Sequence, residues 1–451
     1  MTELLSIILA AGEGTRMRSA LPKVLHPVGG LPLAAHVLHA ATRAGSTAVT
    51  VVIGPNHEAI ADDLQSRMPS VQFVSQTSRL GTGHAVREAR AAFESATGNV
   101  VVLLGDAPLI GAKTISAVTE LLDAGADIAV VGFDAADPTG YGRMLTSGDQ
   151  LLAIREHKDA SEEERAVTLC NSGIIGFKAE TLRQVIDRIE NKNAKGEFYL
   201  TDVIEIANAD GRRVAYTRAD ESEVLGVNDR AQLAKAEAQF QDLRRDDFMK
   251  AGVTLKDPRT VYFSYDTEIA QDVVIEPNVV FGPGVKISEG AVIHAFSHIE
   301  GATIGAGVSV GPFARLRPGA DLAEGAKVGN FVEVKNAKIG KGAKLPHLSY
   351  VGDAEVGAKA NLGAGTITCN YDGVNKSKTV IGAGAFIGSN SSLVAPVTIG
   401  DGAYVASGSV ITRDVAADDL AIARAKQENK PGYASKLRAR AEAIKKSKTK
   451  G

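Results

Sequence analysis

The strongest constraint on the fold of this chain is a six-residue period in its second half. Aliphatic or aromatic residues recur at every sixth position, and glycines cluster between them. One such unit can supply a short strand and a corner with a single large apolar residue pointing inward, so that three units close a triangular coil of about 18 residues. Successive coils would stack at about 4.8 Å, the spacing between strands. The period therefore predicts a parallel β-helix.

The periodic positions fall into several phases that are separated by slips in the register. They are Ile269, Ile275, Phe281, Ile287, Ile293, Ile299, Ile304, Val310, Leu316, Leu322, Val328, Val334, Ile339, Leu345, Val351, Val356, Leu362, Ile381, Ile387, Leu393, Ile399, Val405 and Ile411. The polar, turn-rich stretch 368–379 interrupts the series. We expect a loop that leaves the β-helix there, because loops on rigid scaffolds often carry function.

The first half of the chain follows a different pattern. Short β-branched runs at 6–9, 48–53, 71–74, 99–104 and 128–132 alternate with amphipathic stretches at 33–44, 57–67 and 114–123. This alternation predicts an α/β domain with a mainly parallel sheet. The predicted organisation is an α/β domain over 1–228, a charged helical linker over 229–251, the β-helix over 252–425 and a basic tail over 426–451. The final KKSKTKG is expected to be disordered.

Composition excludes several classes of protein. The formal net charge of the 451 residues is −3, which argues against nucleic acid as the main partner. No apolar run approaches the roughly 20 residues of a membrane span, so we expect no membrane insertion. The two cysteines, Cys170 and Cys369, form neither a disulfide framework nor a metal motif. They fit a reducing, cytoplasmic setting.

A glycine loop follows the first predicted strand. The segment LAAGEGTRM occupies 9–17, and LPKVL follows at 21–25. Backbone N–H groups of such a loop can approach phosphates closely. The loop lacks the GK[ST] of a Walker motif, and Met17 stands where a dinucleotide fingerprint has its third glycine. Arg16 and Lys23 supply cations that could offset charge on a triphosphate as pyrophosphate leaves.

A second candidate is the buried strand VVVLLGD at 100–106, which ends in Asp106. Ligands of open α/β sheets bind at the carboxyl ends of the strands, so Asp106 is placed to hold Mg²⁺. A strand-end aspartate is more often a turn former. The combination of LAAGxGTRM, LPK and the following Ala107-Pro108 resembles the signature of sugar-phosphate nucleotidyltransferases, which gives Asp106 more weight.

Further segments extend this resemblance over nearly the whole chain. They are Gln76, LGTGHA at 80–85, GYGR at 140–143, EHKD at 156–159, NSG at 171–173, GEFYLTD at 196–202 and GVN at 226–228. Together with the β-helix, the chain resembles the family of bifunctional N-acetylglucosamine-1-phosphate uridyltransferase / glucosamine-1-phosphate N-acetyltransferase enzymes. The resemblance implies a left-handed β-helix, a homotrimer and synthesis of UDP-N-acetylglucosamine, a bacterial precursor of peptidoglycan and lipopolysaccharide.

The resemblance also implies roles for individual residues of the first domain. Gln76, Gly81 and Thr82 would read uracil, Gly142, Glu156 and Asn171 would hold the sugar, and Asp106 and Asn228 would carry Mg²⁺. The nucleotide would also contact Leu9, Ala10, Ala11, Gly12 and Lys23. The sugar phosphate, N-acetylglucosamine 1-phosphate, would attack the α-phosphorus of UTP without a protein nucleophile.

The β-helix would acetylate glucosamine 1-phosphate with acetyl-CoA as co-substrate. His347 is the implied base, since an imidazole can accept the proton of an ammonium group. The sugar phosphate would contact Arg317, Lys335, Tyr350, Asn361 and Lys376. In the loop, Asn370 and Tyr371 would enclose the sugar and contact acetyl-CoA. Acetyl-CoA would also contact Ala364, Ser389, Ser407 and Arg424.

Two alternatives remain. The β-helix could be only regulatory, as in glucose-1-phosphate adenylyltransferases; the His347, Tyr350, Asn361 and Lys376 set argues against this, because a purely structural helix does not need it. The chain could instead be a non-enzymatic assembly subunit with both folds, as in exchange-factor subunits of translation initiation. Retention of Arg16, Lys23, Asp106 and Asn228 argues against that possibility.

Overall fold

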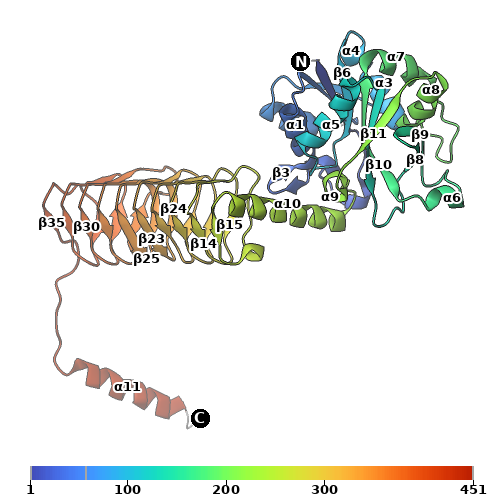
Figure 1. Cartoon of the computed structure of the whole chain (residues 1–451). Helices are drawn as coiled ribbons and strands as arrows, with labels where there is room; N and C mark the ends of the chain where they lie inside the picture. The colour runs from blue at the N-terminus through green and yellow to red at the C-terminus, as the bar shows by residue number, and fades with distance from the viewer. Residues whose placement is uncertain (1–2, 56–57, 449–451) are drawn as a thin grey trace. The chain divides into compact units, whose positions relative to one another are not determined.

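The chain folds into two compact units, which are treated separately (Figure 1). The computed structural model describes residues 3–55 and 58–448. Within them, unit 1 runs to Lys250 and also takes in Tyr262–Thr267, while unit 2 comprises Ala251–Val261 and the residues from Glu268 onward. The segment 229–251, for which a linker helix was predicted, contains helix α10 (Arg230–Lys250). Its Ala236 and Phe240 pack against Val28, Leu33 and Val227 of unit 1.

Unit 1 is built on a nine-stranded sheet with the order β5-β4-β1-β6-β10-β7-β11-β9-β8. The strands are β1 (Leu4–Ala10), β4 (Ala48–Ile53), β5 (Gln72–Ser75), β6 (Asn99–Leu104), β7 (Ile128–Asp134), β8 (Arg143–Ser147), β9 (Gln150–Arg155), β10 (Leu169–Lys178) and β11 (Val214–Arg218), beside a small hairpin of β2 (Pro27–Val28) and β3 (Leu31–Pro32). Strands β5, β4, β1 and β6 pair in parallel, whereas β10 is antiparallel to both β6 and β7.

Helices cover both faces of this sheet, as Figure 1 shows. They are α1 (Leu33–Arg43), α2 (Glu58–Arg67), α3 (Thr82–Glu88), α4 (Arg90–Phe93), α5 (Ala112–Asp123), α6 (Glu162–Arg165), α7 (Ala179–Val185), α8 (Val203–Ala209) and α9 (Glu221–Val224). Alternate residues of β1 enter two cores: Leu4 and Ile8 meet α1, α2 and α5, while Leu5 and Ile7 meet α3, α7 and α8. Burial on both faces explains the continuous apolar run of the strand.

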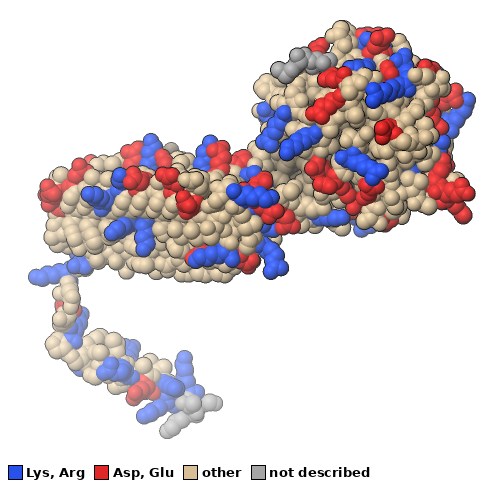
Figure 2. All heavy atoms as spheres, in the orientation of Figure 1, with Lys and Arg blue, Asp and Glu red and all other residues tan. Residues whose placement is uncertain are grey.

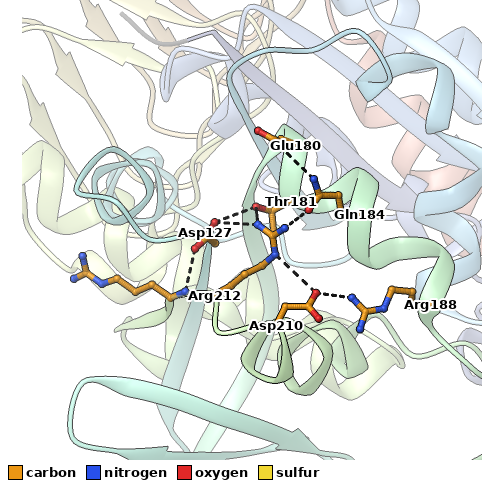
Figure 3. A network of polar contacts seen from close by, with 8 residues as sticks. Asp127, Glu180, Thr181, Gln184, Arg188, Asp210 and Arg212 are labelled. Carbon is orange, nitrogen blue, oxygen red and sulfur yellow. Dashed lines mark hydrogen bonds and ion pairs between the residues drawn. The ribbon is translucent and has the colours of Figure 1, made fainter.

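A polar network joins the beginnings of β7 and β11 to α7 (Figure 3). The Asp127 carboxylate accepts hydrogen bonds from Thr181 Oγ1 at 3.2 Å, Arg212 Nη1 at 3.3 Å and the backbone N of Arg213 at 3.0 Å. Arg212 also bonds to Gln184. These charge-assisted bonds fix the register of β11 against β7, at the end of the sheet away from the glycine loop.

Unit 2 is a parallel β-helix, as the six-residue period predicts. Its strands are β12 (Thr254–Leu255), β13 (Glu268–Ile269), β14 (Val274–Ile275), β15 (Val280–Phe281), β16 (Lys286–Ile287), β17 (Val292–Ile293), β18 (His298–Ile299), β19 (Ala302–Ile304), β20 (Ser309–Val310), β21 (Arg315–Leu316), β22 (Ala320–Leu322), β23 (Lys327–Asn330), β24 (Glu333–Ile339), β25 (Lys344–His347), β26 (Tyr350–Val356), β27 (Asn361–Leu362), β28 (Ile367–Cys369), β29 (Thr379–Ile381), β30 (Phe386–Ile387), β31 (Ser392–Val394), β32 (Val397–Ile399), β33 (Tyr404–Val405), β34 (Val410–Ile411) and β35 (Leu420–Ala421).

The periodic residues stack into three inward columns. One column, for example, pairs Ile287 with Ile304, and Ile304 with Leu322 one coil further on. Every predicted periodic residue is buried except Ile269, which is partly exposed in an early coil. Stacked coils bury a continuous apolar core that a single coil could not form.

Two parts of unit 2 differ from expectation. The excursion is confirmed, but its ends are part of the β-helix: Thr368 and Thr379 are buried on β28 and β29, and the segment 371–376 is exposed. Lys445 to Lys448, expected to be disordered, lie in helix α11 (Tyr433–Lys448), and 449–451 lie outside the described residues. A composition of Ala, Lys, Arg and Glu favours helix even without packing. Figure 2 shows Lys and Arg gathered along this helix.

Among residues 3–55 and 58–448, no helix is long and apolar enough to cross a bilayer.

Candidate functional sites

The order of the strands in unit 1 explains where its candidate site lies. From β1 the chain moves to β4 and β5 on one side, then returns to β6 on the other side of β1. The loops that follow β1 and β6 therefore run apart and leave a crevice at their carboxyl ends, where open α/β sheets bind ligands. The glycine loop follows β1 and Asp106 follows β6, so the topology brings the two predicted motifs together.

Three polar side chains converge at this crevice. Lys23 Nζ forms an ion pair with Asp106 Oδ2 and donates a hydrogen bond to Asn228 Oδ1 at 3.2 Å. The backbone N of Val227 donates to the Asp106 carbonyl at 2.8 Å, which places Asn228 beside the carboxylate. Gly14, with φ of 63°, allows the loop to approach Lys23, because a Cβ there would lie 2.5 Å from Lys23 Cβ. The glycine motif thus positions the lysine.

The cluster has an oxygen that is free to bind a cation. Asp106 Oδ1 is buried and has no hydrogen-bond partner among the described residues. With Asn228 Oδ1 nearby, one carboxylate and one amide oxygen face the crevice. Mg²⁺ commonly takes only one or two protein oxygens, with water and substrate phosphates as its other ligands. These donors fit the predicted metal. Within the described ranges no cluster of three or more His, Cys, Asp or Glu could hold a metal by itself.

Two adjoining cavities extend from Asp106. The first, of about 290 Å³, is lined by Leu9, Ala10, Ala11, Gly12, Lys23, Gln76, Gly81 and Thr82 among others. The second, of about 280 Å³, is lined by Gly142, Glu156, Asn171, Asn228, Tyr141 and Thr201 among others. All the predicted nucleotide contacts therefore line the first cavity or the second, and the predicted sugar contacts line the second. Arg16 is exposed and lines a third cavity, of about 390 Å³, that includes Asn228.

Close backbone approach fixes the walls of both cavities. Gln76 is buried, and its Nε2 donates to the Gly81 carbonyl at 3.1 Å. A Cβ at Gly81, whose φ is 113°, would lie 2.5 Å from the Phe198 carbonyl oxygen. In the second cavity the backbone N of Asn171 donates to the Gly142 carbonyl at 2.8 Å. Glycine is required at Gly81 for this geometry.

Glu156 is a buried carboxylic acid of the second cavity, which Asp106 also lines. Burial raises the pKa of Glu156, and Thr201 Oγ1 donates to its Oε1 at 3.4 Å. A partly desolvated carboxylate next to an open cavity suits hydrogen bonding to sugar hydroxyl groups. Tyr141 and Thr201 also line this cavity but were not predicted as site residues. Both lie inside motifs quoted from the sequence, GYGR and GEFYLTD, and could have been proposed from them.

In unit 2, four predicted sugar-phosphate residues lie near one another. Lys376 lies close enough to Lys335 for its positive charge to lower the pKa of Lys335. Arg317 Nη1 forms an ion pair with Glu333 Oε1 at 2.8 Å, which raises the pKa of Arg317, as does, to a smaller extent, Tyr350. The Tyr350 ring folds over Gly352, where a Cβ would lie 2.3 Å from the phenol oxygen. Two adjacent lysines near this arginine suit a phosphate ligand.

The predicted base and most of the predicted acetyl-CoA residues lie in a single row along the β-helix. His347, Ala364, Ser389 and Ser407 each precede a corner residue with left-handed φ, so they form one row along the prism. Backbone hydrogen bonds between successive coils confirm the stacking: the Asn390 N donates to the Ala364 carbonyl and the Gly408 N to the Ser389 carbonyl, both at 2.8 Å. Arg424 Nη1 donates to the Ser407 carbonyl at 2.7 Å. The predicted base and three predicted acetyl-CoA residues thus share a row.

Asn361, Asn370 and Tyr371 belong to neither group. Asn361 lies on β27, paired with Lys344 and Phe386. Asn370 is buried at the base of the excursion and donates to Asp353, whereas Tyr371 is exposed within it. Their predicted roles therefore rest on the resemblance.

Comparisons with known proteins agree with the two-part architecture. Residues 6–194 match the family model described as MobA-like NTP transferase domain. Residues 266–301 and 378–413 match bacterial transferase hexapeptide repeats. A protein of Azorhizobium caulinodans named "Bifunctional protein GlmU" is 56% identical over 97% of both chains. The chain belongs to the GlmU family.

Two other GlmU proteins have similar identity. The Xanthobacter autotrophicus protein is 55% identical over 97% of both chains, and the Agrobacterium fabrum protein is 56% identical over 99% of this chain and 98% of its own length. Membership of the GlmU family confirms the predicted family, the fold class with its left-handed β-helix, and the prediction of uridyltransferase and acetyltransferase activities on one chain.

Proposed function

We propose that unit 2 transfers acetyl from acetyl-CoA to glucosamine 1-phosphate and that unit 1 then transfers uridylyl from UTP to the product, forming UDP-N-acetylglucosamine. The observation that carries the proposal is the convergence of Lys23, Asp106 and Asn228 between two adjoining cavities. The first cavity has the glycine loop for a nucleotide, and the second has polar groups for a sugar. The reacting phosphates would meet at their junction.

In unit 1 the residues would act by position and charge. A phosphate oxygen of the sugar phosphate attacks the α-phosphorus of UTP while the bond to the bridging oxygen breaks and pyrophosphate leaves. Lys23 and Arg16 would offset the charge that collects on the departing group. Asp106 and Asn228 would hold Mg²⁺, which when bound adds charge neutralisation at the phosphates. Because the sugar phosphate is itself the nucleophile, orientation supplies much of the acceleration.

In unit 2, His347 would act as general base. The amine nitrogen of glucosamine 1-phosphate attacks the thioester carbon, His347 takes the proton, and the carbon–sulfur bond breaks. The departing thiolate then receives that proton. Arg317, Lys335 and Lys376 would hold the phosphate of the sugar. The row of Ala364, Ser389 and Ser407 offers a track for the extended coenzyme beginning at the base.

An exposed aromatic ladder supports a homotrimer. Phe296 and Phe313 stack with centroids 4.9 Å apart, and Phe313 and Phe331 at 5.1 Å, although each ring is about half exposed. Leu348, 60% exposed, follows His347 at the next corner. Such a stripe indicates an interface, and it ends beside the proposed base. We therefore propose that a neighbouring copy covers this corner. Phe313→Ser should lower the mass measured by light scattering, whereas an unchanged mass would refute this interface.

We also propose a cytoplasmic location. Cys170 is buried on β10 of unit 1 and Cys369 is partly buried on β28 of unit 2; both are free thiols. A reducing compartment suits such residues.

A reconstitution experiment tests the whole proposal. Purified protein receives glucosamine 1-phosphate, acetyl-CoA, UTP and Mg²⁺, and each is then omitted in turn. The proposal expects nucleotide sugar only with the full set, and N-acetylglucosamine 1-phosphate when UTP is absent. Nucleotide sugar formed only from pre-acetylated substrate would instead make the β-helix regulatory. Asp106→Ala should abolish uridylyl transfer and His347→Ala acetyl transfer, each leaving the other activity intact.

A further inference from the structure

The row of residues before the left-handed corners continues in the direction opposite to the proposed coenzyme track. Beyond His347 its members are Asn330, Pro312 and Ala295, which precede Phe331, Phe313 and Phe296. Asn330 is the polar member of this continuation. It is the register partner of His347, because β23 and β25 pair Asn330 directly with His347.

The two coils approach unusually closely at this point. A Cβ on Gly329 would lie 1.8 Å from the Pro346 carbonyl oxygen, so only glycine allows the approach. The backbone N of Leu348 donates to the Asn330 carbonyl at 3.0 Å. Gly329, which precedes Asn330, and Leu348, which follows His347, therefore both keep the Asn330 and His347 side chains next to each other.

The side chains form a directed hydrogen bond. His347 Nδ1 lies 2.5 Å from Asn330 Oδ1. An amide oxygen can only accept, so Nδ1 carries the hydrogen of the neutral imidazole. The lone pair then lies on Nε2, the nitrogen at the far side of the ring. Because His347 is exposed and packing does not restrain its ring, this bond is the contact that selects both the tautomer and the orientation.

We propose that Asn330 is a positioning residue of the acetyltransferase site, which orients His347 so that Nε2 receives the proton of the substrate amine. The inference rests on the proposed role of His347 as base and adds to it the group that directs it. A base that is oriented by a third group is the arrangement of catalytic triads. Here the third group is a neutral amide in the preceding coil.

A neutral partner has a chemical consequence. A carboxylate in this position would stabilise the imidazolium and raise the pKa of the base, whereas an amide orients the ring without adding charge. The charged groups on the flanking strands are Lys327 of β23 and Lys344 of β25, and β27 on the other side carries none. Asn330 therefore fixes the ring without the negative charge that Asn330→Asp would place beside it.

The test uses full-length Asn330→Ala and Asn330→Asp proteins. Thiol release from acetyl-CoA is followed with glucosamine 1-phosphate across pH, and uridylyl transfer by the same preparation serves as the folding control. For Asn330→Ala we expect kcat to fall about ten-fold while KM for both substrates changes less than two-fold. For Asn330→Asp, which has nearly the same size, we expect the acid limb of the kcat/KM profile to move to higher pH.

The outcomes separate this inference from the proposed function. If His347→Ala abolishes acetylation while both Asn330 variants keep the parent kcat and pH profile, the positioning role is refuted and the base stands. If His347→Ala keeps full acetylation, the base assignment fails and the inference fails with it. A uniform loss of activity in Asn330→Asp without a shift of the acid limb would indicate packing alone and would also refute it.

Discussion

The ion pair between Lys23 and Asp106 predicts that a catalytic lysine competes with the metal. Lys23 Nζ contacts Asp106 Oδ2 and Asn228 Oδ1, and only Asp106 Oδ1 of the proposed metal-binding oxygens has no partner; the Lys23 and Asp106 side chains are 11% and 19% exposed. Before nucleotide binds, a divalent cation at Asp106 Oδ1 and Asn228 Oδ1 must compete with this ammonium group for the charge of the carboxylate and for the amide oxygen. Replacement of Lys23 by Met should therefore tighten metal binding to the nucleotide-free protein although it impairs turnover.

The magnitude follows from the geometry. Two unit charges about 4 Å apart attract by ~4 kcal/mol at an effective dielectric constant of about 20. Desolvation of the partly buried pair offsets much of this attraction. A net contribution of about 1.4 kcal/mol corresponds to roughly ten-fold in a dissociation constant. We accordingly expect Lys23→Met to bind Mn²⁺ about ten-fold more tightly in the absence of UTP.

The assay is a titration of nucleotide-free protein with Mn²⁺, with free ion measured by electron paramagnetic resonance. Arg79→Met is the matched control, because Arg79 lines the same cavity but pairs with Glu13 at 2.6 Å. It should leave the Mn²⁺ affinity within about two-fold of the parent. Asp106→Asn should weaken binding strongly. If Lys23→Met binds Mn²⁺ equally or more weakly than the parent, the competition is refuted.

Three further predictions concern stability and the sugar-phosphate site. Burial, with smaller contributions from Glu205 and Glu156, raises the pKa of Asp202 to about 6; folded protein thus holds a proton that unfolded protein releases, and stability falls as pH rises from about 4 to 6. Asp202→Asn should therefore add about 1 kcal/mol at pH 8, allowing for partial exposure, and almost nothing at about pH 3, below the unfolded pKa, by urea denaturation. Leu316→Ala should destabilise unit 2 by about 3 kcal/mol in the same assay, because Leu316 is fully buried; a loss below about 1 kcal/mol would contradict the stacked core. Gly352→Ala should displace the Tyr350 ring and raise KM for glucosamine 1-phosphate without changing KM for N-acetylglucosamine 1-phosphate; equal values in variant and parent would show that the ring does not contact the sugar.

Local patterns in the sequence were sufficient for the elements and for the β-helix core. The strands expected at 48–53 and 99–104 have these bounds in β4 and β6. The six-residue period predicts the buried positions correctly because every coil repeats the same inward position. Whether a residue is buried therefore depends on its place in the local repeat. The candidate residues of unit 1 could likewise be collected from motifs, since the motifs follow strands whose carboxyl ends meet at one crevice.

Long-range pairings could not be predicted in the same way. The antiparallel β10 is an example, because strand direction depends on the path between β9 and β10 and not on the residues of the strand. The contact between Asn330 and His347 is another. The two residues are 17 positions apart, and only the stacking of coils makes them neighbours. Arranging the sequence in coils before choosing site residues would have placed Asn330 next to the base.

One row of residues along the β-helix has a fixed spacing: His347, Ala364, Ser389 and Ser407. Each member belongs to a successive coil, so the row advances by about 4.8 Å per member and spans about 14 Å from the first to the last. The distance between two members of the row is a whole number of coil spacings, because the backbone hydrogen bonds between coils fix that spacing. The excursion at 371–376 adds residues between Ala364 and Ser389 without adding a coil. A change in the length of this loop would therefore leave the distance between the ligand contacts constant. Only the gain or loss of a complete coil of the β-helix would change the length of ligand that can contact the whole row.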